Sequence, residues 1–158
     1  MAQRDPPESE AAVDFGVLLN LAFGGFKLRL HAELARAGFD DVGPSFGYVF
    51  RLLAPEPLNL SAVASALAIS APGALKIVND MVDKGYVERQ AHAVDARQKL
   101  LALTPRARQA MKVARRFHGQ FEAALARQLG ADDAHAARRV LEAIVAAAPA
   151  GEVQLRAV

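Results

Sequence analysis

The side chains best suited to chemistry in this sequence are polar and basic residues between positions 70 and 106. Lys and Arg bind phosphate groups, and Asn can form two hydrogen bonds with the edge of a base. These residue types predict binding to a nucleic acid more readily than catalysis. The candidate contacts are Ser70, Lys76, Asn79, Lys84, Arg89, Asp95, Arg97 and Arg106.

The local distribution of charge supports this interpretation better than the total charge does. The net charge of the 158-residue chain is only +2, but residues 106–127 contain six basic residues and one acidic residue. One explanation is a solvated helix face, because exposed basic residues are ordinary. The other is that Arg106 and Arg108 lie close enough to DNA to contact phosphates.

Residues for catalysis or metal binding are sparse. The sequence has no Cys, which excludes disulfides, thiolate nucleophiles and thiolate zinc sites. Of the four histidines, only His118 has an acidic partner, Glu122, at the spacing of a helical metal site. One such pair is weak evidence, so we expect no metal and no cofactor. Without a Gly-rich phosphate loop or a Ser/His/Asp arrangement, an enzyme is not expected.

A capped helix, a short strand, a polar loop and a second strand follow one another in the middle of the chain. Ser70 can cap a helix that runs to Lys84, and Gly85 can end it in the left-handed conformation. Residues 86–89 and 99–103 have the length and composition of strands, and the nine residues between them are too polar for a core. This order predicts a winged helix-turn-helix.

Three short motifs in this segment resemble those of a known protein family. They are Lys84-Gly85-Tyr86-Val87-Glu88-Arg89, Asp95-x-Arg97 and Leu101-x-Leu103-Thr104. Each alone is weak, but their joint order and spacing are specific, and they resemble the MarR family of bacterial transcriptional regulators. The resemblance covers residues 12–148. It implies a mainly α (α+β) fold, a winged helix-turn-helix with long N- and C-terminal dimerisation helices.

The flanking sequence predicts further helices around this unit. Apolar periodicity and breakers predict helices over 13–37, 45–54 and 61–67, with a short edge strand or turn at 58–60. Thr104 and Pro105 begin a long helix to Gln128, and Asp132 or Asp133 caps a last helix through Ala147. We therefore expect a flexible N-terminus (1–11), an N-terminal dimerisation helix and connector (12–43), a winged helix-turn-helix DNA-binding domain (44–104), C-terminal dimerisation helices (105–148) and a tail (149–158).

The first predicted helix has two apolar stripes. One includes Val17, Leu21 and Leu28, and the other includes Phe15 and Leu19. A helix with two apolar faces must bury both, and a second copy of the chain best explains the second face. The Ala-rich run over 134–148 suits the close approach of helices, so the sequence predicts a homodimer.

The sequence favours a cytoplasmic protein with no membrane partner. No apolar run approaches the roughly eighteen residues of a membrane-spanning helix. The first ten residues are polar, acidic and Pro-containing, unlike a signal peptide.

The resemblance implies particular roles at double-stranded DNA. The helix enters the major groove, Arg97 enters the minor groove, and Asp95 braces the wing. A symmetric dimer implies a pseudo-palindromic operator. On the helix, Lys76 and Lys84 are expected to contact the backbone, and Asn79 can pair with adenine if it points into the groove. The alternative for the wing is a surface hairpin with an incidental ion pair.

Members of the resembled family often hold aromatic or phenolic anions between the dimer helices and the winged helix. An aromatic wall with one cation would suit an aromatic carboxylate. The alternative is that the phenylalanines are ordinary core and the Arg a surface residue. The candidate lining is Phe23, Phe26, Leu30, Phe46, Phe50 and Arg51.

The function expected from the sequence is that of a homodimeric DNA-binding transcriptional regulator, a repressor in preference to an activator, relieved by a small aromatic or phenolic ligand. Two alternatives stay open. One is a winged-helix protein-interaction module with weak or no DNA binding, which the turn Ala71-Pro72-Gly73-Ala74-Leu75 favours because few of its residues can recognise a base. The other is the helical dimerisation part of an enzyme.

Overall fold

The computed structural model describes residues 13–91 and 99–148. These residues are mainly helical, with three short strands. In chain order the elements are α1 (Phe15–Arg36), α2 (Phe46–Leu53), β1 (Leu58–Asn59), α3 (Leu60–Ala66), α4 (Ala71–Asp83), β2 (Val87–Ala91), β3 (Lys99–Leu103), α5 (Pro105–Leu129) and α6 (Ala131–Ala146).

The strands form an antiparallel sheet in the order β1-β3-β2. In the β2–β3 hairpin Val87 lies opposite Leu103 and Ala91 opposite Lys99, and β1 pairs Leu58 with Leu101. Because β3 lies between the other two strands, all three residues at its C-terminal end are buried. The sheet therefore leads directly from its buried centre into α5.

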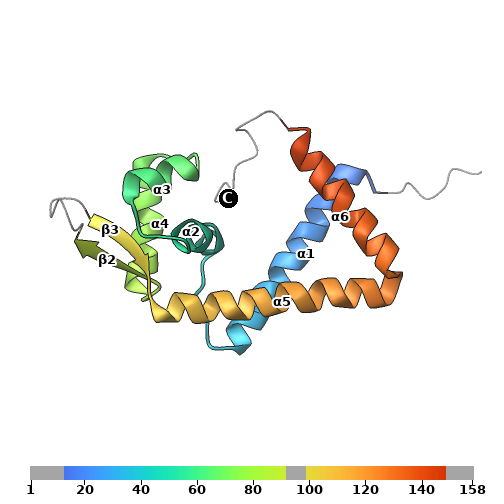
Figure 1. Cartoon of the computed structure of the whole chain (residues 1–158), viewed down its shortest axis with the longest axis horizontal. Coiled ribbons are helices and arrows are strands. Elements are labelled where there is room, and N and C mark those ends of the chain that lie inside the picture. Colours follow the sequence, from blue (N-terminus) through green and yellow to red (C-terminus); the bar gives the residue numbers. More distant parts are fainter. Residues whose placement is uncertain (1–12, 92–98, 149–158) are drawn as a thin grey trace, which may run out of the picture.

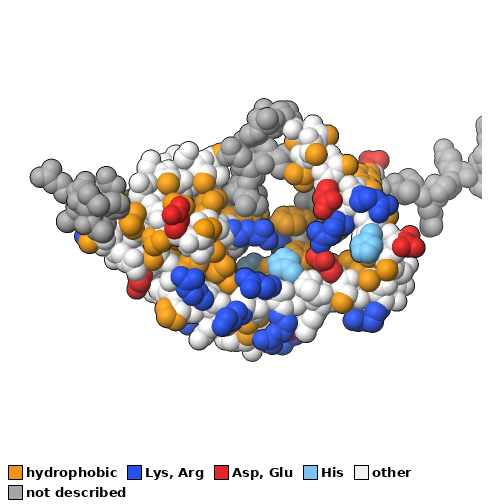
Figure 2. Space-filling model, viewed as in Figure 1, with side chains coloured by type: hydrophobic (Ala, Val, Ile, Leu, Met, Phe, Trp, Pro, Cys, Tyr) orange, Lys and Arg blue, Asp and Glu red, His pale blue; other side chains and the backbone are white. Residues whose placement is uncertain are grey.

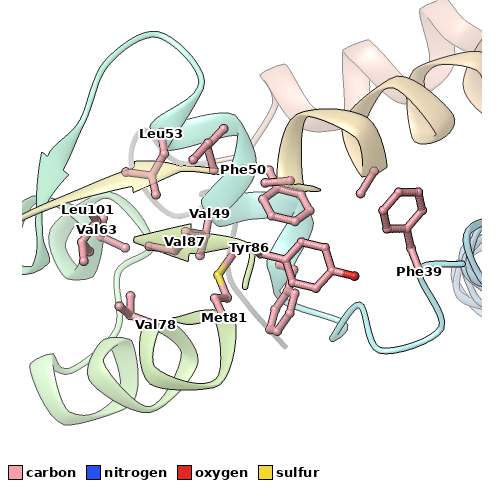
Figure 3. Close-up of a cluster of buried hydrophobic side chains, with 14 of the residues drawn as sticks. Phe39, Val49, Phe50, Leu53, Val63, Val78, Met81, Tyr86, Val87 and Leu101 are labelled. Atoms are coloured by element: carbon pink, nitrogen blue, oxygen red, sulfur yellow. The ribbon is translucent and has the colours of Figure 1, made fainter. Parts of the chain in front are cut away.

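The winged-helix lobe, which consists of α2, α3, α4 and the sheet, has its core around Tyr86. This ring is completely buried, and Phe46 and Phe50 of α2 lie against it at centroid distances of 5.6 and 5.7 Å. Met81 of α4 and Val87 of β2 belong to the same cluster, which Figure 3 shows. Burial of aromatic and apolar surface is the main favourable term in folding, so this cluster holds α4 against the sheet.

The long helices extend away from the winged-helix lobe. In Figure 1, α5 begins at the sheet and runs out of the lobe, crosses α1, and is followed by α6, which turns back sharply. Phe26 of α1 contacts Phe117 and Phe121 of α5, with ring centroids 5.4 and 5.0 Å apart. This aromatic contact fixes the crossing of α1 and α5.

Two of these helices leave large apolar side chains uncovered. The exposed residues on α1 and α6 have 40% to 75% of their surface accessible, and α6 has no buried residue. They are Phe15, Val17, Leu18, Leu21, Phe23 and Leu28 on α1, and Val140, Leu141, Ile144 and Val145 on α6. Apolar patches of this kind mark interaction surfaces.

The fold class predicted from the sequence is confirmed, and most helix boundaries agree within two residues. One prediction about capping is wrong. Gly130, with φ of 99°, precedes α6, and Asp132 and Asp133 lie in its first turn instead of at the cap. Their negative charges there still favour the helix dipole. The expected flexible N-terminus and C-terminal tail lie outside the described residues.

None of the helices in residues 13–91 and 99–148 is by itself long and apolar enough to cross a membrane. Only α3 and α4 taken together reach that composition, and the chain bends by 112° between them.

Candidate nucleic-acid interface

The second helix of the helix-turn-helix, α4, is fixed at its start by a local hydrogen bond. The hydroxyl Oγ of Ser70 accepts from the Gly73 backbone N–H at 3.2 Å, as the sequence predicts for a cap. Ala74, Val78 and Met81 are buried on one face of the helix. The opposite face of α4 is therefore held toward solvent.

The solvent face of α4 lines an open groove. Residues spaced three and four apart along a helix share one side, so this face is continuous over three turns. Its N-terminal half is apolar or basic, and its C-terminal half is acidic. The lining residues are Pro72, Leu75, Lys76, Asn79, Asp80 and Asp83.

Two of the predicted contacts, Asn79 and Arg89, are bonded to each other. Arg89 lies on β2 beside α4, and its Nη2 donates to the Oδ1 of Asn79 at 2.5 Å. Both side chains are exposed, so the pair joins the helix to the strand at the protein surface. The structure thus brings these two predicted DNA contacts together.

The two predicted lysines have different surroundings. The Nζ of Lys84 lies 3.0 Å from the Oδ2 of Asp80 and 5.2 Å from the ring centroid of Phe46. Lys84 is thus partly engaged within the protein. Lys76 is exposed on the groove and forms no ion pair with any of the described residues. Lys76 is therefore the better placed of the two for a phosphate.

Arg106, which the sequence placed among the DNA contacts, instead joins three segments of the protein. Its Nη2 donates to Oδ1 and Oδ2 of Asp41 at 2.9 and 3.0 Å, and to the Tyr86 hydroxyl at 3.3 Å. The Tyr86 hydroxyl also donates to Asp41. The guanidinium lies 4.8 Å from the Tyr86 ring centroid and 5.7 Å from that of Phe39. In Figure 3 the Tyr86 hydroxyl points toward Phe39.

The pKa values of this network follow from its contacts. Burial acts to raise the pKa of Asp41, but hydrogen bonds from Tyr86 and Arg106 and the positive charge of Arg106 hold it below its usual value of 3.8. Burial and the hydrogen bond to Asp41 raise the pKa of Tyr86 to about 12. At neutral pH the Asp41 carboxylate, the Tyr86 phenol and the Arg106 cation therefore all have the form that the network needs.

The wing residues Asp95 and Arg97 lie outside the described residues, as does His92. The structure does place the base of the wing, because Ala91 and Lys99 are paired across β2 and β3. At the opposite end of the hairpin, Thr104 Oγ1 donates to the Gly85 carbonyl at 2.7 Å and joins the start of α5 to the end of the α4 turn. The roles of Asp95 and Arg97 stay predictions.

The predicted ligand residues divide between two clusters. Phe46 and Phe50 are 2% and 5% exposed and belong to the core around Tyr86, which agrees with the alternative interpretation from the sequence. Phe26 lies in the crossing of α1 and α5, whereas Phe23 is exposed, with the Nζ of Lys27 4.8 Å from its ring centroid. Leu30 is partly buried against the core cluster, so the predicted lining residues do not gather in one cluster.

Arg51 is exposed on α2 and lies near the aromatic crossing. Burial lowers the pKa of His118, and so does the positive charge of Arg51, while Glu122 opposes the shift. His118 stacks on Phe26 with centroids 5.2 Å apart. Arg51 of α2 is thus close enough to His118 of α5 to influence its charge, and His118 in turn contacts Phe26 of α1.

A separate cleft of about 160 Å³ lies between the end of α1 and the middle of α5. Its lining residues are Glu33, Arg36, Ala37, Val113, Arg116, Phe117 and Gln120, and none of them was predicted as a ligand contact. Among the residues that the structure describes, no group of three His, Asp or Glu side chains is arranged to hold a metal ion.

Basic side chains follow the exposed side of α5. Arg108, Lys112, Arg115 and Arg116 are all exposed. In Figure 2, Lys and Arg side chains gather along the edge of the molecule where α5 runs. This arrangement fits both interpretations from the sequence, a solvated face and a contact with phosphates.

Sequence reasoning missed Asp41 as part of the functional region. Asp41 is 45 residues from Tyr86 and 65 from Arg106, and it follows another Asp in an ordinary turn. Nothing in its local sequence indicates such distant partners. Tyr86 was assigned to a strand, but it precedes β2, and its ring lies in the core.

Residues 44–98 match the model of the MarR family. This segment includes α2, α3, α4 and β2. No curated protein sequence matches the chain.

Solved structures resemble most of the chain in fold. RV1404 from Mycobacterium tuberculosis is 23% identical, with a TM-score of 0.71 over 93% of this chain and all of that one. A mutant of E. coli MarR is 18% identical, with a TM-score of 0.64 over 86% of this chain and 99% of that one. A mutant of S. aureus MepR bound to an oligodeoxyribonucleotide is 17% identical, with a TM-score of 0.61 over 85% of this chain and 98% of that one.

Proposed function

Because the chain is a MarR-family protein by its winged helix-turn-helix at residues 44–98, we propose that it is a homodimeric transcriptional regulator that binds double-stranded DNA. It binds a pseudo-palindromic operator in the cytoplasm and acts as a repressor. The observation that most supports this proposal is the solvent face of α4, which is held clear of the protein by its buried opposite face. A helix presented in this way fits the major groove.

The homodimer part of the proposal is supported by the uncovered apolar side chains of α1 and α6. Phe15, Leu21 and Ile144 are 61%, 59% and 40% exposed in the single chain. A symmetric contact between two copies would remove such side chains from water, at about 25 cal/mol per Å² of apolar surface. Two α4 helices related by this symmetry would contact two half-sites, about 34 Å apart on the DNA.

We further propose that a small aromatic acid relieves DNA binding. The described residues that suit such a ligand are Arg51, as the cation, and the aromatic group at the crossing of α1 and α5, near Phe26. The Phe46 and Phe50 side chains are less suitable because they are already packed in the core. A titration with a salicylate-like acid should weaken operator binding by the wild type and not by Arg51→Ala.

A gel-shift assay with the intergenic DNA beside the gene tests DNA binding, at low salt and at about 0.15 M salt. A regulator should form a complex that weakens as salt rises and that resists competition by unrelated DNA. The matched variants are Lys76→Ala, on the open face of α4, and Lys27→Ala, on α1. Only Lys76→Ala should weaken the complex.

The second candidate is a protein-interaction module with weak or no DNA binding. Leu75 is 41% exposed on the face of α4, and the acidic Asp80 and Asp83 share that face. Both features are unfavourable next to phosphates. Binding that is equally weak for all duplexes and unchanged in Lys76→Ala would favour this second function.

A further inference from the structure

We propose that Asn79 and Arg89 act as one base-recognition unit with a preference for guanine. This inference rests on the proposed function, because it assigns a base to the DNA surface described above. It also differs from the expectation that Asn79 pairs with adenine, because the structure engages the oxygen of that amide.

The geometry of the pair determines which groups it presents. Arg89 Nη2 donates to Asn79 Oδ1 at 2.5 Å, from β2 to the third turn of α4. A hydrogen bond from a guanidinium is charge-assisted and about twice as strong as one between neutral groups. The bond fixes the amide with Oδ1 toward Arg89, so that Nδ2 carries the remaining hydrogen-bonding capacity.

The exposed pair therefore presents donors and hardly any acceptor. Asn79 offers the two N–H groups of Nδ2, and Arg89 offers the guanidinium N–H groups that Asn79 does not use. Both side chains are exposed, and Asn79 also lines the open groove of α4. A base that satisfies this pair must supply acceptors.

The major-groove edges of the four bases differ in this respect. Guanine presents two acceptors, N7 and O6, whereas adenine presents one acceptor and one donor. The amino group of adenine needs an acceptor, and the Asn79 oxygen that would serve is bonded to Arg89. Thymine offers a single acceptor and cytosine a donor. Guanine is thus the base that matches the pair.

The side chains around Asn79 are consistent with a contact between Asn79 and a base. Leu75, one turn earlier on the same face, is apolar and cannot hydrogen-bond to a base. The Oδ2 of Asp80, next to Asn79 on the same groove, is 3.0 Å from the Nζ of Lys84, which offsets the negative charge of Asp80. Asn79 is therefore the one uncharged side chain on this face that can hydrogen-bond to a base edge.

The test is selection of duplexes from a randomised DNA library by the wild type, Asn79→Asp, Arg89→Ala and the control Lys76→Ala. The best wild-type duplex is then varied at each base pair, and relative affinities are measured. Asn79→Asp keeps an acceptor for Arg89 but has no N–H donor. Arg89→Ala frees the amide oxygen of Asn79. The three substituted side chains, Asn79, Arg89 and Lys76, are all exposed, so thermal unfolding should show the same midpoint for all four proteins.

The expected result is a guanine in each wild-type half-site whose replacement weakens binding about 5-fold to 150-fold. Asn79→Asp should lose that preference, and Arg89→Ala should change it to adenine. Replacing the guanine by 7-deazaguanine should weaken the wild type but not Asn79→Asp. Lys76→Ala should lower affinity for all duplexes by the same factor.

Three outcomes would overturn the inference. If both variants keep the wild-type base at every position, the pair does not recognise a base. If they weaken binding equally on all duplexes, the pair contacts the backbone. In either case the proposed function stands. If the wild type enriches no sequence at all, the proposed function fails together with the inference.

Discussion

Asp41 connects parts of the chain that do not adjoin in sequence. Its carboxylate, in the turn after α1, accepts from Tyr86 at the end of the α4 turn and from Arg106 at the start of α5. A charged group in several hydrogen bonds is costly to leave without partners. We therefore interpret Asp41 as the residue that fixes the winged-helix lobe relative to the long helices.

The first prediction concerns Asp41→Asn. Because the folded pKa of Asp41 lies below 3.8, its contribution to stability is present above that value and is lost as the pH falls through the folded pKa. The pair with Arg106 is partly exposed, so screening limits the expected loss to about 1 kcal/mol at pH 7. Urea unfolding at pH 7 and pH 3 measures it, and the difference between the two proteins should shrink at pH 3.

The second prediction concerns the stability of Tyr86→Phe at alkaline pH. A pKa raised to about 12 in the folded state means that the unfolded state releases its proton first. Tyr86 therefore contributes stability that is present below its ordinary pKa of 10 and disappears as the pH rises toward 12. Tyr86→Phe should lack this loss between pH 10 and 12. An identical alkaline profile in both proteins would contradict the assigned hydrogen bond.

For single residues, the sequence predicted the role of a residue type better than it predicted which distant residue the side chain contacts. The cap at Ser70 was predictable because donor and acceptor are three residues apart. Arg106 was assigned to phosphate because only its neighbours along the chain were visible, whereas its partner is 65 residues away. Tertiary contacts of this kind depend on how elements pack, which local sequence does not determine.

Among the elements, the β2–β3 hairpin is the one that supports the wing. Its five-residue strands pair in full register, from Val87 with Leu103 to Ala91 with Lys99. The motif Asp95-x-Arg97 lies between them and outside the described residues. The pairing fixes the two ends of the segment that carries this motif, at Ala91 and Lys99.

The prediction for the wing is that Arg97→Ala weakens operator binding by about 1–3 kcal/mol with little change in thermal stability. The reason is that an arginine in the narrow minor groove interacts with its strong negative potential. Asp95→Ala should weaken binding less. Fluorescence anisotropy with operator DNA measures both variants. Equal affinity of Arg97→Ala and the wild type would rule out the minor-groove role.

The helices themselves were largely predictable from their ends. Thr104 and Pro105 begin α5, and Gly85, with φ of 73°, ends the α4 turn, as their residue types indicate. The cap of α6 was not predictable in the same way, because two Asp residues stood where only one could cap. The positive φ of Gly130 moved the start of the helix ahead of both.

At the scale of the whole molecule, the single chain exposes more apolar surface on α1 and α6 than a monomer would be expected to keep in water. We predict that light scattering at micromolar concentration gives the mass of two chains. Leu21→Glu, which places a charge on the exposed face of α1, should shift the protein toward one chain. Leu75→Glu, on the exposed face of α4, is the matched control and should leave the mass at two chains.

A monomeric wild type that unfolds cooperatively would contradict the assignment of α1 and α6 to an interface. The fold class was predictable because it depends on element order and periodicity, which are properties of the sequence itself. How the winged-helix lobe is joined to the long helices was not predictable, because that depends on the contacts of Asp41 and on the aromatic crossing at Phe26.

The length of α5 determines how far a small tilt of this helix moves the winged-helix lobe. The helix has 25 residues, so it is about 37 Å long, and its first turn is hydrogen-bonded through Thr104 to the end of the α4 turn. The helix therefore carries the winged-helix lobe at one end, far from the other end at α6. A tilt of about 5° at the far end displaces that lobe by about 3 Å, which is close to the 3.4 Å rise of one base step. If the chain binds DNA as proposed, a rotation of about 5° at the far end of α5 is therefore enough to move the lobe by about one base step.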